Sequence, residues 1–578
     1  MFAINTKTTA CIALAATVVV AGGCVSAHVQ NRAVIALPRL AAAQPAAFTG
    51  NCTDLATKIA GFANTTITAT TTVAAGTLKV GRQDIAEHCL ITGKMFERIS
   101  PVDGAAYAIG FEMRLPKAWN GRFLHQGNGG IDGAVVTATG AFGGGPITNA
   151  LQKGFAVLSS DAGHSGPTPA FGIDPQARLD YGYQAVAKLT PMAKNVIAQT
   201  YGKGPDRSYF GGCSNGGRHA LVTAARLPAD YDGVIAGAPG YNLPKAAVAN
   251  IAGAQLYAPL VTTTPITSPA ILETAYTLTE RKLLAASVLA KCDALDGSAD
   301  GMVQDVNACQ AAFKIATDVP TCTGARDGTC LTAAQKTAVG KIYSGPTTST
   351  GALIYSSFPY DAGAGGGGIA FWEFTAPLVL DSGAVGQIFK VTPDPFVGFN
   401  GPAFSLTSNI DTLVAQISAT NSVYTESSLS FMTPPDPTNL SKLRDRGGKI
   451  MVYHGVSDQI FSANDSESWY KGVQTNNGGD ASLFARFFRV PGMGHCSGGP
   501  TADQFDPLDA MVKWVETGLA PDSLTASVRG VGNAGGANAD VPATWATTRS
   551  RPLCSYPRVA RYSGTGSVDD AASFACLP

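Results

Sequence analysis

The sequence lacks a surplus of charge of either sign. It contains 41 Lys and Arg residues against 41 Asp and Glu residues, and neither sign forms a run or a stripe. Proteins that neutralise phosphate groups carry such basic stripes, so nucleic acid is excluded as a partner. The 45% hydrophobic and 8% aromatic content is ordinary for a globular chain, which predicts a folded protein rather than a disordered one.

Metal-binding histidine patterns are also missing. The seven histidines are scattered, and the sequence has neither an H-E-x-x-H motif nor any close histidine pair. Such pairs supply the zinc ligands of metallohydrolases. This class of enzyme is therefore excluded.

No segment after the N-terminus is long and apolar enough for a transmembrane span, which needs about 20 residues. The N-terminus itself has Lys7, the apolar run "CIALAATVVVAG" and small residues after it, which is the layout of a signal peptide. Residues 1–27 are therefore predicted to be a signal peptide, and the protein is predicted to be exported to the periplasm or the extracellular space.

Two processing sites compete at the end of this segment. The letters AGGC at 21–24 resemble a lipobox that lacks its usual Leu, with Cys24 as the lipidated residue. The letters VSA at 25–27 resemble an ordinary cleavage site with small residues. The first alternative predicts an outer-membrane lipoprotein anchored at Cys24, and the second predicts a protein without an anchor.

Export determines how the cysteines are interpreted. Of 12 cysteines, Cys11 and Cys24 lie in the N-terminal segment, which leaves ten. An even number in an oxidising compartment favours disulfides over metal thiolates. Connectivity does not follow from sequence alone, but proximity along the chain favours the pairs Cys52–Cys89, Cys292–Cys309, Cys322–Cys330 and Cys554–Cys576, leaving Cys213 and Cys496 for each other.

Strand-like and helix-like patterns alternate after a low-complexity Ala/Thr segment at about 28–75. Strands are expected at 107–116, 121–130, 154–163, 207–212, 231–240, 447–458 and 485–496, and helices at 177–202, 217–227 and 507–518. Strands separated by helices predict an α/β fold with a mostly parallel sheet. The alternation stops at residues 241–445, which are rich in Gly, Thr, Ser and Pro, so this segment is interpreted as an insertion between a first part (28–240) and a second part (446–578).

A nucleophile motif lies where the fourth of these strands meets a helix. Gly212-x-Ser214-x-Gly216 in this position is typical of a nucleophile elbow, whose sharp turn needs small flanking residues. The alternative is a glycine-rich turn with an ordinary helix-capping serine. In α/β hydrolases the acid and the base follow the serine in the order Ser, Asp, His.

The expected base and acid follow in that order. Only His454 and His495 lie beyond the elbow and its helix, and His495 sits in a loop after a strand, where a base is needed. Asp458 follows the preceding strand and is predicted to orient that base. His454 lies inside or at the end of the same strand and is interpreted as a structural histidine.

The positions of two cysteines agree with this triad. Cys213 precedes the predicted nucleophile and Cys496 follows the predicted base. If the serine and imidazole lie within about 3 Å of each other, their neighbours can approach the roughly 5.5 Å Cα separation that a disulfide prefers.

The sequence resembles the tannase and feruloyl esterase family of α/β hydrolases. The resemblance rests on the pairs Cys213-Ser214 and His495-Cys496, on Asp458, and on the stretches "AFGIDPQARLDYGY", "YDGVIAGAPGYNLPKA", "RDRGGKIMVYHGVSD" and "RFFRVPGMGHCSGGP". It implies an α/β-hydrolase fold in which residues 241–445 form a lid domain, and it implies that the bridge between Cys213 and Cys496 is real. It also implies a carboxylic ester hydrolase that acts on esters of aromatic acids.

An oxyanion hole and a calcium site are expected as well. The backbone amide of Asn215, which follows the nucleophile, is one expected oxyanion donor, and similarity to the family assigns the second to Gly130 in the loop "GNGG". The stretch "CDALDGSADGMVQD" supplies closely spaced carboxylates of the kind that suits Ca²⁺. Similarity to the family predicts a structural Ca²⁺ bound by Asp293, Asp296 and Asp300 together with the carbonyls of Ser298 and Met302. The alternative is a solvated acidic turn.

Aromatic side chains are expected to line the pocket. Phe461 should face the cleft, and Trp372, Phe371 and Phe389 are candidates to stack on a substrate ring, although each alone is more often a core residue. No Arg lies between Arg326 and Arg444, and Lys390 is the only Lys or Arg from 342 to 441.

A substrate carboxylate favours a bidentate arginine, so this scarcity of cations favours neutral phenolic esters such as feruloyl or galloyl esters. The alternatives are hydrolysis of a terephthalate monoester, and a binding protein without catalytic activity on the same fold.

Overall fold

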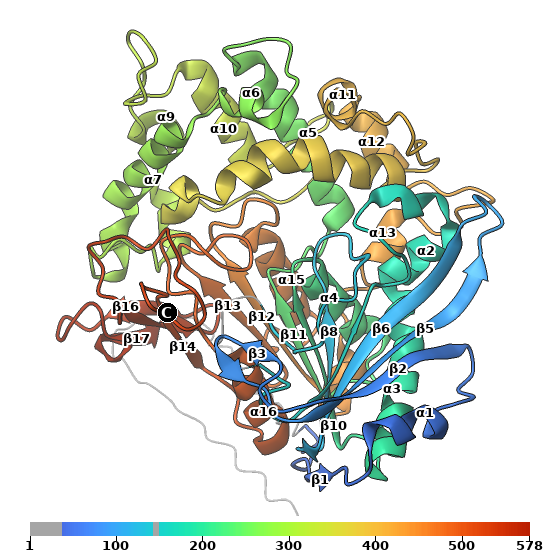
Figure 1. The fold of residues 1–578 in the computed structure, drawn as a ribbon. Helices are drawn as coiled ribbons and strands as arrows, with labels where there is room; N and C mark the ends of the chain where they lie inside the picture. The colour runs from blue at the N-terminus through green and yellow to red at the C-terminus, as the bar shows by residue number, and fades with distance from the viewer. Residues whose placement is uncertain (1–36, 143–148) are drawn as a thin grey trace, which may run out of the picture. The chain divides into compact units, whose positions relative to one another are not determined.

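A nine-stranded sheet carries the fold (Figure 1). The structure is a computed structural model, and it describes residues 37–142 and 149–578. The predicted signal peptide at 1–27 and the predicted lipid anchor at Cys24 lie outside the described residues. The described part from Leu37 to Pro578 forms one unit, so the predicted division into core and lid domains remains a prediction.

The strands of this sheet combine a parallel part with an antiparallel edge. From β13 to β9 all neighbouring strands are parallel, whereas β9, β6, β5 and β2 are antiparallel to each other in turn. In spatial order the strands are β13 (Ala485–Val490), β12 (Lys449–Gly455), β11 (Gly233–Gly237), β10 (Arg207–Cys213), β8 (Arg122–Gly127), β9 (Ala156–Ser160), β6 (Ala106–Pro116), β5 (His88–Ile99) and β2 (Thr65–Val73). The expected α/β fold with a mostly parallel sheet is confirmed.

Helices cover both faces of the sheet. Alternate residues of one strand point to opposite faces, and in β10 Tyr209 packs with Met511 and Trp514 of one core cluster while Phe210 belongs to the other cluster with Leu221. The helices of this part are α1 (Leu55–Lys58), α2 (Pro175–Leu179), α3 (Ala185–Tyr201), α4 (Asn215–Arg226), α15 (Ala463–Thr475) and α16 (Pro507–Thr517). Central strands β9, β11 and β12 are buried at every residue, as expected for strands covered on both faces.

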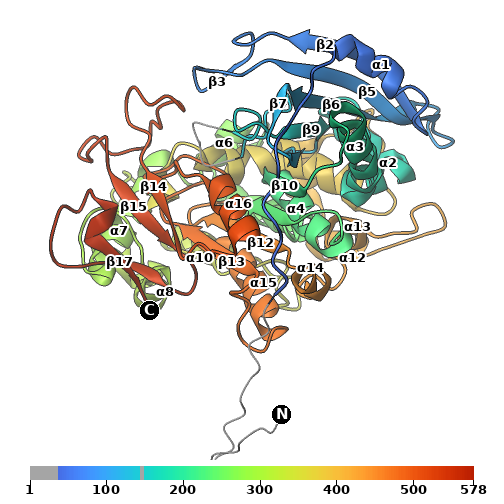
Figure 2. The same ribbon diagram turned by 90° about the horizontal axis from the view of Figure 1, so that it is seen from below.

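The low-complexity stretch before residue 75 contains an edge strand that the sequence did not predict. Its threonine-rich part forms β2, which pairs with β5, another strand missing from the expectation. Figure 2 shows these two blue strands at one margin of the fold. Threonine is β-branched and tolerates a half-exposed strand, which explains how a polar run joins the sheet.

Short two-stranded sheets flank the main sheet. They pair β1 (Ala46–Ala47) with β7 (Ala118–Trp119), β3 (Lys79–Val80) with β4 (Gln83–Asp84), β14 (Ser523–Ser527) with β15 (Ser550–Cys554), and β16 (Val559–Tyr562) with β17 (Phe574–Leu577). Among the described residues no helix is long and apolar enough to cross a membrane.

The insertion at 241–445 is mainly helical, and many of its helices, among them α5, α6, α10, α11 and α12, lie in the upper part of Figure 1, whereas α13 lies lower, near α2. They are α5 (Leu243–Tyr257), α6 (Pro269–Glu273), α7 (Leu278–Cys292), α8 (Val306–Ala312), α9 (Ile315–Asp318), α10 (Ala333–Tyr343), α11 (Gly401–Thr407), α12 (Ile410–Gln416), α13 (Ser428–Met432) and α14 (Ser441–Asp445). The sequence showed only short periodic pieces here. Helix α5 explains part of this difference, because it is buried on nearly every side and so has no apolar stripe.

Five disulfides link the described chain. The pairs are Cys52–Cys89, Cys213–Cys496, Cys292–Cys309, Cys322–Cys330 and Cys554–Cys576. All five pairings predicted from the sequence are therefore present in the structure.

Candidate active site

Ser214 occupies a sharp turn between β10 and α4. Its backbone has φ 64° and ψ −125°, a conformation that few residues with a side chain adopt. A Cβ atom on Gly212 or Gly216 would lie 2.4 or 2.3 Å from the carbonyl oxygen of Gly127. The glycines of the motif are therefore needed for β8, β10 and α4 to approach one another, and the turn has the geometry of a nucleophile elbow.

Three side chains from distant parts of the chain meet at this turn. His495 Nε2 lies 2.8 Å from Ser214 Oγ, and His495 Nδ1 lies 2.7 Å from Asp458 Oδ2. The other oxygen of Asp458 accepts hydrogen bonds from the amides of Ile460 and Phe461, each at 3.0 Å. The Ser, His and Asp predicted from the sequence thus form a continuous hydrogen-bonded chain.

The environment of Asp458 favours its charged form. Burial by itself raises the pKa of a carboxyl group, but the adjacent His495 and the hydrogen bonds to the carboxylate outweigh burial and hold the pKa of Asp458 well below its usual range. His454 also lies 3.3 Å from this carboxylate. Its ring nitrogens contact Ser466 Oγ at 2.8 Å and the carbonyl oxygen of Phe461 at 2.9 Å, as expected for a structural histidine.

A disulfide joins the two loops that carry Ser214 and His495. Cys213 and Cys496, the neighbours of Ser214 and His495, have Cα atoms 6.1 Å apart. The bond therefore cross-links the end of β10 to the loop after β13 at the point where their side chains must meet.

Two backbone amides lie where an oxyanion hole is expected. Asn215 is the first residue of α4, so its amide has no intrahelical acceptor. Gly130 lines the same cavity with φ 64°, and its amide has no acceptor within the described part of the chain. Neither amide has an acceptor among the described residues, and their predicted role as an oxyanion hole stays a prediction.

A buried carboxylate that the sequence did not indicate connects these two elements. Asp132, two residues after Gly130, accepts a hydrogen bond from Asn215 Nδ2 at 2.7 Å, and its Oδ2 lies 2.9 Å from His219 Nε2. Arg218 Nε in turn donates to Asn215 Oδ1 at 2.7 Å. Burial raises the pKa of Asp132 to about 7. No motif pointed to Asp132, because its role depends on the folded position of its loop beside α4.

A small cavity of about 60 Å³ opens beside Ser214. Its walls are largely apolar or aromatic. They include the loop that carries Gly130, the start of α5, residues 372–384 and the loop after β12. The lining residues are Gly130, Ile131, Tyr181, Ser214, Asn215, Leu243, Trp372, Leu380, Asp381, Ala384, Ile460 and Phe461. Trp372 and Phe461 both stand edge-to-face against the imidazole of His495, with ring centroids 4.7 and 5.4 Å from it.

Comparison with known proteins identifies the family. The family model described as "Tannase and feruloyl esterase" matches residues 89–577. The chain belongs to this family. It is therefore a carboxylic ester hydrolase, as the sequence predicted.

Individual family members resemble the chain over most of its length. The mono(2-hydroxyethyl) terephthalate hydrolase of Piscinibacter sakaiensis is 38% identical over 525 residues, which cover 85% of each chain. A probable feruloyl esterase B-1 of Neosartorya fischeri is 30% identical over 493 residues, covering 81% of this chain and 83% of its own. Feruloyl esterase B from Aspergillus oryzae, a solved structure, is 25% identical with a TM-score of 0.72, covering 91% of this chain and 99% of its own.

Of the aromatic residues predicted to bind substrate, two line the cavity beside Ser214 and two do not. Trp372 and Phe461 line the cavity beside Ser214, whereas Phe371 is 48% exposed and stands edge-to-face on Trp372. Phe389 has no exposed surface and is not among the residues that line the cavity. The structure places Phe389 in the hydrophobic core, because its helical turn packs inward.

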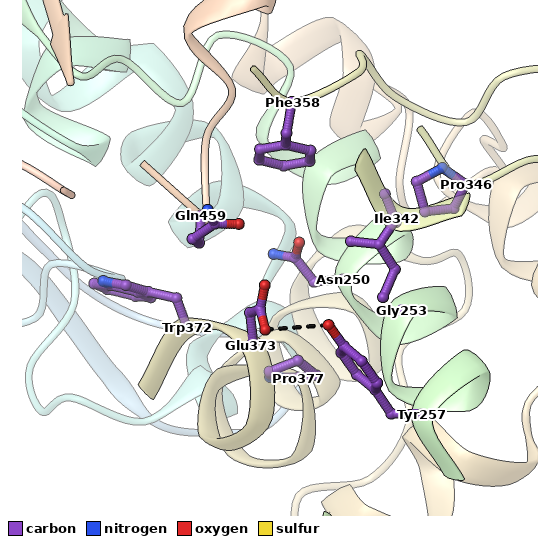
Figure 3. Close-up of a pocket in the computed structure, with 11 residues that line it drawn as sticks. Asn250, Gly253, Tyr257, Ile342, Pro346, Phe358, Trp372, Glu373, Pro377 and Gln459 are labelled. Carbon is purple, nitrogen blue, oxygen red and sulfur yellow. Dashed lines mark hydrogen bonds between the residues drawn. The ribbon is translucent and has the colours of Figure 1, made fainter. Parts of the chain in front are cut away.

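A second, smaller cavity of about 20 Å³ shares Trp372 with the first. Figure 3 shows its polar members Asn250, Tyr257, Glu373 and Gln459, with the Tyr257 hydroxyl donating to Glu373 Oε2 at 3.1 Å. Burial raises the pKa of Glu373 to about 7. A second cavity with several polar side chains in an otherwise mainly apolar lining therefore adjoins the cavity beside Ser214.

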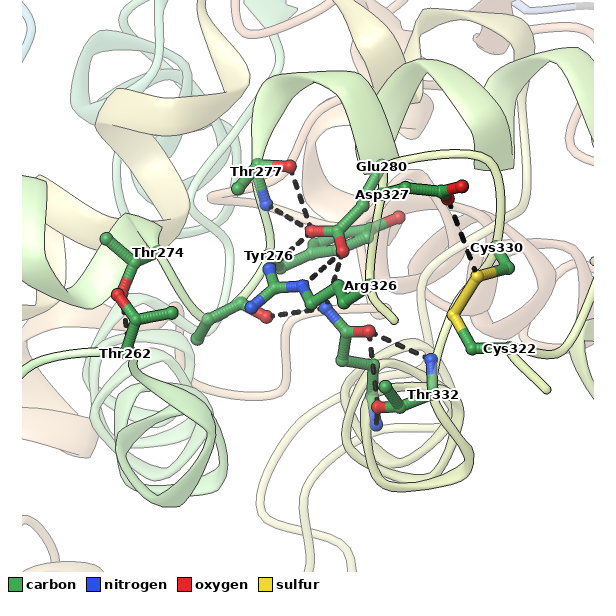
Figure 4. A network of polar contacts seen from close by, with 12 residues as sticks. Thr262, Thr274, Tyr276, Thr277, Glu280, Cys322, Arg326, Asp327, Cys330 and Thr332 are labelled. Atoms are coloured by element: carbon green, nitrogen blue, oxygen red, sulfur yellow. Dashed lines mark hydrogen bonds and ion pairs between the residues drawn. A yellow bond between two sulfur atoms is a disulfide. The ribbon is translucent and has the colours of Figure 1, made fainter. Parts of the chain in front are cut away.

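Two cations of the insertion, Arg326 and Lys390, are engaged outside this cavity. Arg326 donates to both carboxylate oxygens of Glu280, in the network beside the Cys322–Cys330 disulfide in Figure 4. Lys390 pairs with Asp394, with Nζ and Oδ1 2.5 Å apart. No Lys or Arg is among the residues that line the cavity beside Ser214. A substrate carboxylate bound there would have no positively charged partner from the lining.

The acidic stretch predicted to bind calcium contains oxygen atoms without partners. The carbonyls of Ser298 and Met302 accept no hydrogen bond from a described residue, and one carboxylate oxygen of Asp300 is buried without a partner. Burial raises the pKa of Asp293, and it raises that of Asp296 to about 7. These features fit a cation that accepts oxygen ligands.

Two observations limit how such an ion would be held. Among the residues that the structure describes, no three acidic, His or Cys side chains group as a metal site by themselves. The other oxygen of Asp300 pairs with Arg551 Nη2 at 2.6 Å. Backbone carbonyls would therefore have to complete the coordination.

Proposed function

We propose that this protein is an exported serine carboxylesterase that hydrolyses esters of phenolic acids, such as feruloyl or galloyl esters. The observation that carries the proposal is the hydrogen-bonded chain from Ser214 Oγ through His495 to the buried Asp458. A serine hydroxyl is a weak nucleophile, and this arrangement is the one that activates it.

The reaction begins with attack of Ser214 Oγ on the ester carbonyl carbon. His495 Nε2 takes the hydroxyl proton, while Asp458 holds the imidazole in the required tautomer and stabilises its charged form. The same proton then passes to the departing alcohol oxygen, which leaves an acyl group on Ser214. Water, deprotonated by His495, attacks this acyl group and releases the acid.

Negative charge on the former carbonyl oxygen would be stabilised by the amides of Gly130 and Asn215. Neither amide has a competing acceptor among the described residues. The N-terminus of α4 adds favourable electrostatic potential at the same place. Removal of one such donor in other enzymes costs about 3–4 kcal/mol of transition-state stabilisation.

The preference for neutral phenolic esters rests on the lining of the cavity. Trp372 and Phe461 offer aromatic surfaces to a ring, and no Lys or Arg side chain lies among the lining residues. Hydrolysis of a terephthalate monoester is the second candidate, because the relative at 38% identity carries that name. Its charged substrate needs a cationic partner that this lining does not supply.

Export and calcium complete the proposal. Five disulfides agree with an oxidising compartment, and the N-terminal sequence supplies the signal, with either Cys24 or Ala27 at its processing site. Ca²⁺ would be held by Asp293, Asp296, Asp300 and the two carbonyls named above, and it would act structurally, away from the reacting atoms.

A side-by-side assay tests the proposed function. The purified protein is given methyl ferulate, methyl gallate and mono(2-hydroxyethyl) terephthalate, and we expect the two phenolic esters to have the higher kcat/KM. Faster hydrolysis of the terephthalate monoester would overturn the preference. Ser214→Ala should remove turnover and labelling by a fluorophosphonate probe, and a wild-type protein that this probe does not label would indicate a binding protein instead.

A further inference from the structure

The cavity beside Ser214 contains one carboxyl group that the catalytic cycle does not use. Asp381 lies on a π-helical turn, η8 (Pro377–Asp381), and is 4% exposed while lining the cavity. π-Helical turns place side chains off the regular helical pattern and occur often at functional sites. The turn therefore directs an acidic side chain into a pocket whose walls are mainly apolar.

The hydrogen bonding of Asp381 is incomplete. Its Oδ2 accepts from Asn250 Nδ2 at 3.2 Å, and no described residue donates to its other oxygen. No ion pair to a described Lys or Arg neutralises it, and burial raises its pKa to about 7. A buried carboxyl group with one oxygen lacking a hydrogen-bond donor lowers the free energy of unfolding, and a donor from a bound ligand would offset this loss.

The other polar groups of the lining are already engaged. The Tyr181 hydroxyl is directed to the Gly130 carbonyl oxygen at 3.4 Å, and the side-chain amide of Asn215 is held by Asp132 and Arg218. Ser214 is committed to His495. Among the acidic and amide side chains of the lining, Asp381 is thus the one with an acceptor left for substrate.

We propose that Asp381 is a specificity-determining residue, which accepts a hydrogen bond from a ring hydroxyl of the acyl group. This inference rests on the proposed function and narrows it to esters of hydroxylated aromatic acids. Trp372 and Phe461 would sandwich or flank the ring, and Asp381 would distinguish a free hydroxyl from an alkylated one. The same side chain disfavours a ring carboxylate, because two acidic groups would meet without a cation between them.

The test compares pairs of substrates that differ only at the ring hydroxyl. Methyl ferulate and methyl 3,4-dimethoxycinnamate share the ester and the ring, but the second has its hydroxyl capped by a methyl group. For the wild-type protein we expect kcat/KM to be about 10- to 100-fold higher for the ferulate, the range of a hydrogen bond to a charged or strongly polar group.

Substitution of Asp381 should change this ratio. In Asp381→Leu the ratio should fall to within about threefold of one. In Asp381→Asn the amide oxygen remains as an acceptor, so part of the preference for the free hydroxyl should remain. The amide nitrogen is a donor and carries no acidic proton, so hydrolysis of mono(2-hydroxyethyl) terephthalate should rise relative to wild type. The matched control is Asp394→Asn, an acid in the same part of the insertion that pairs with Lys390 outside the lining and should keep the wild-type ratio.

Folding and chemistry are separated by a binding measurement. In Ser214→Ala, calorimetry should show tighter binding of methyl ferulate than of its capped analogue. In Ser214→Ala/Asp381→Leu this difference in affinity should be lost. Thermal unfolding confirms that each variant is folded. An unchanged ratio in a folded Asp381→Leu variant would overturn the inference while leaving the esterase proposal intact. Absence of hydrolysis of every ester by the wild-type protein would instead overturn the proposed function.

Discussion

At the scale of single residues, the site beside Ser214 depends on side chains that orient the proposed oxyanion donors as well as on the side chains that would react. Asp132 is the clearest example, because its carboxyl group accepts a hydrogen bond from the Asn215 side chain and contacts the His219 ring, while its own loop carries Gly130. It therefore ties together the two elements whose amides are proposed to stabilise the oxyanion. We consider it a positioning residue, since it does not line the cavity.

Replacing Asp132 should slow the chemical step more than it weakens substrate binding. We expect Asp132→Ala to lower kcat about 10- to 100-fold with KM changed less than threefold, because misplaced donors act only on the transition state. Asp132→Asn retains an acceptor for Asn215 and should recover much of the activity. Steady-state kinetics on methyl ferulate measure both values, and a rise in KM at unchanged kcat would contradict the positioning role.

The residues that could be predicted from the sequence are those whose chemistry is tied to local spacing. Ser214 sits in a glycine pattern, and His495 and Asp458 follow strands in the order known for the fold. Asp381 and Phe389 could not be assigned in this way. Whether a side chain on a helical turn faces a cavity or the core depends on how that turn packs, and the π-helical turns shift the facing positions away from a 3.6-residue period.

At the scale of elements, the covalent link between β10 and the loop after β13 is the feature with the largest expected effect. Cys213 and Cys496 are 283 residues apart in sequence, so the bond removes much freedom from the unfolded chain. It also ties Ser214, the proposed nucleophile, to His495, the proposed base. Stability and activity should therefore both depend on it.

Removing this bond tests the dependence. We expect Cys213→Ser/Cys496→Ser to lose about 2–5 kcal/mol of unfolding free energy and to lower kcat at temperatures where the variant remains folded. The control Cys554→Ser/Cys576→Ser removes a bond between β15 and β17, which lie outside the cavity lining, and should lower stability without lowering kcat. Urea unfolding measures the stability of each variant, and kinetics on methyl ferulate measure its kcat. Equal kcat values in both variants would contradict a catalytic role for the Cys213–Cys496 bond.

The elements themselves were predicted with uneven success. Strands β6 and β8 to β13 and the helix after Ser214 follow from alternation of apolar runs with helical periods, and all are present. Strand β2 could not be recognised because Thr and Ala dominate it, and α5 could not because burial on most sides removes its polar face. In both cases the tertiary surroundings, rather than a local period, determine the structure.

At the scale of the whole molecule, stability should respond to calcium. If Ca²⁺ binds the acidic stretch at Asp293–Met302, EDTA should lower the Tm measured by differential scanning fluorimetry, and Ca²⁺ but not Mg²⁺ should restore it. At 100 times the dissociation constant the ion contributes about 2.7 kcal/mol. Asp296→Asn should remove the response, whereas an unchanged Tm in EDTA would contradict the site.

The free energy of unfolding should also fall as the pH rises from about 4 to about 7. Burial raises the pKa of Asp132, Asp161, Asp296, Asp381 and Glu373 to about 7. Unfolded carboxyl groups titrate near pH 4, so between about pH 4 and 7 the native state binds more protons than the unfolded state, and the free energy of unfolding decreases with pH.

The expected slope is about 1.4 kcal/mol per pH unit for each net proton difference. Urea unfolding at pH 5, 6 and 7 in EDTA measures it, and Asp161→Asn should make it shallower. Asp458 has the opposite linkage, since its depressed pKa gives stability that is lost only as the pH falls below about 4. A free energy of unfolding that rises from pH 5 to 7 would contradict the assignment.

The cross-link at the catalytic centre also determines what happens when a protease cuts the chain. The whole insertion at 241–445 lies between Cys213 and Cys496 in sequence. A single cut anywhere in it therefore yields two fragments that stay joined beside Ser214 and His495, so a nicked molecule would keep its full mass on a gel without reductant and separate into two pieces only when thiol is added.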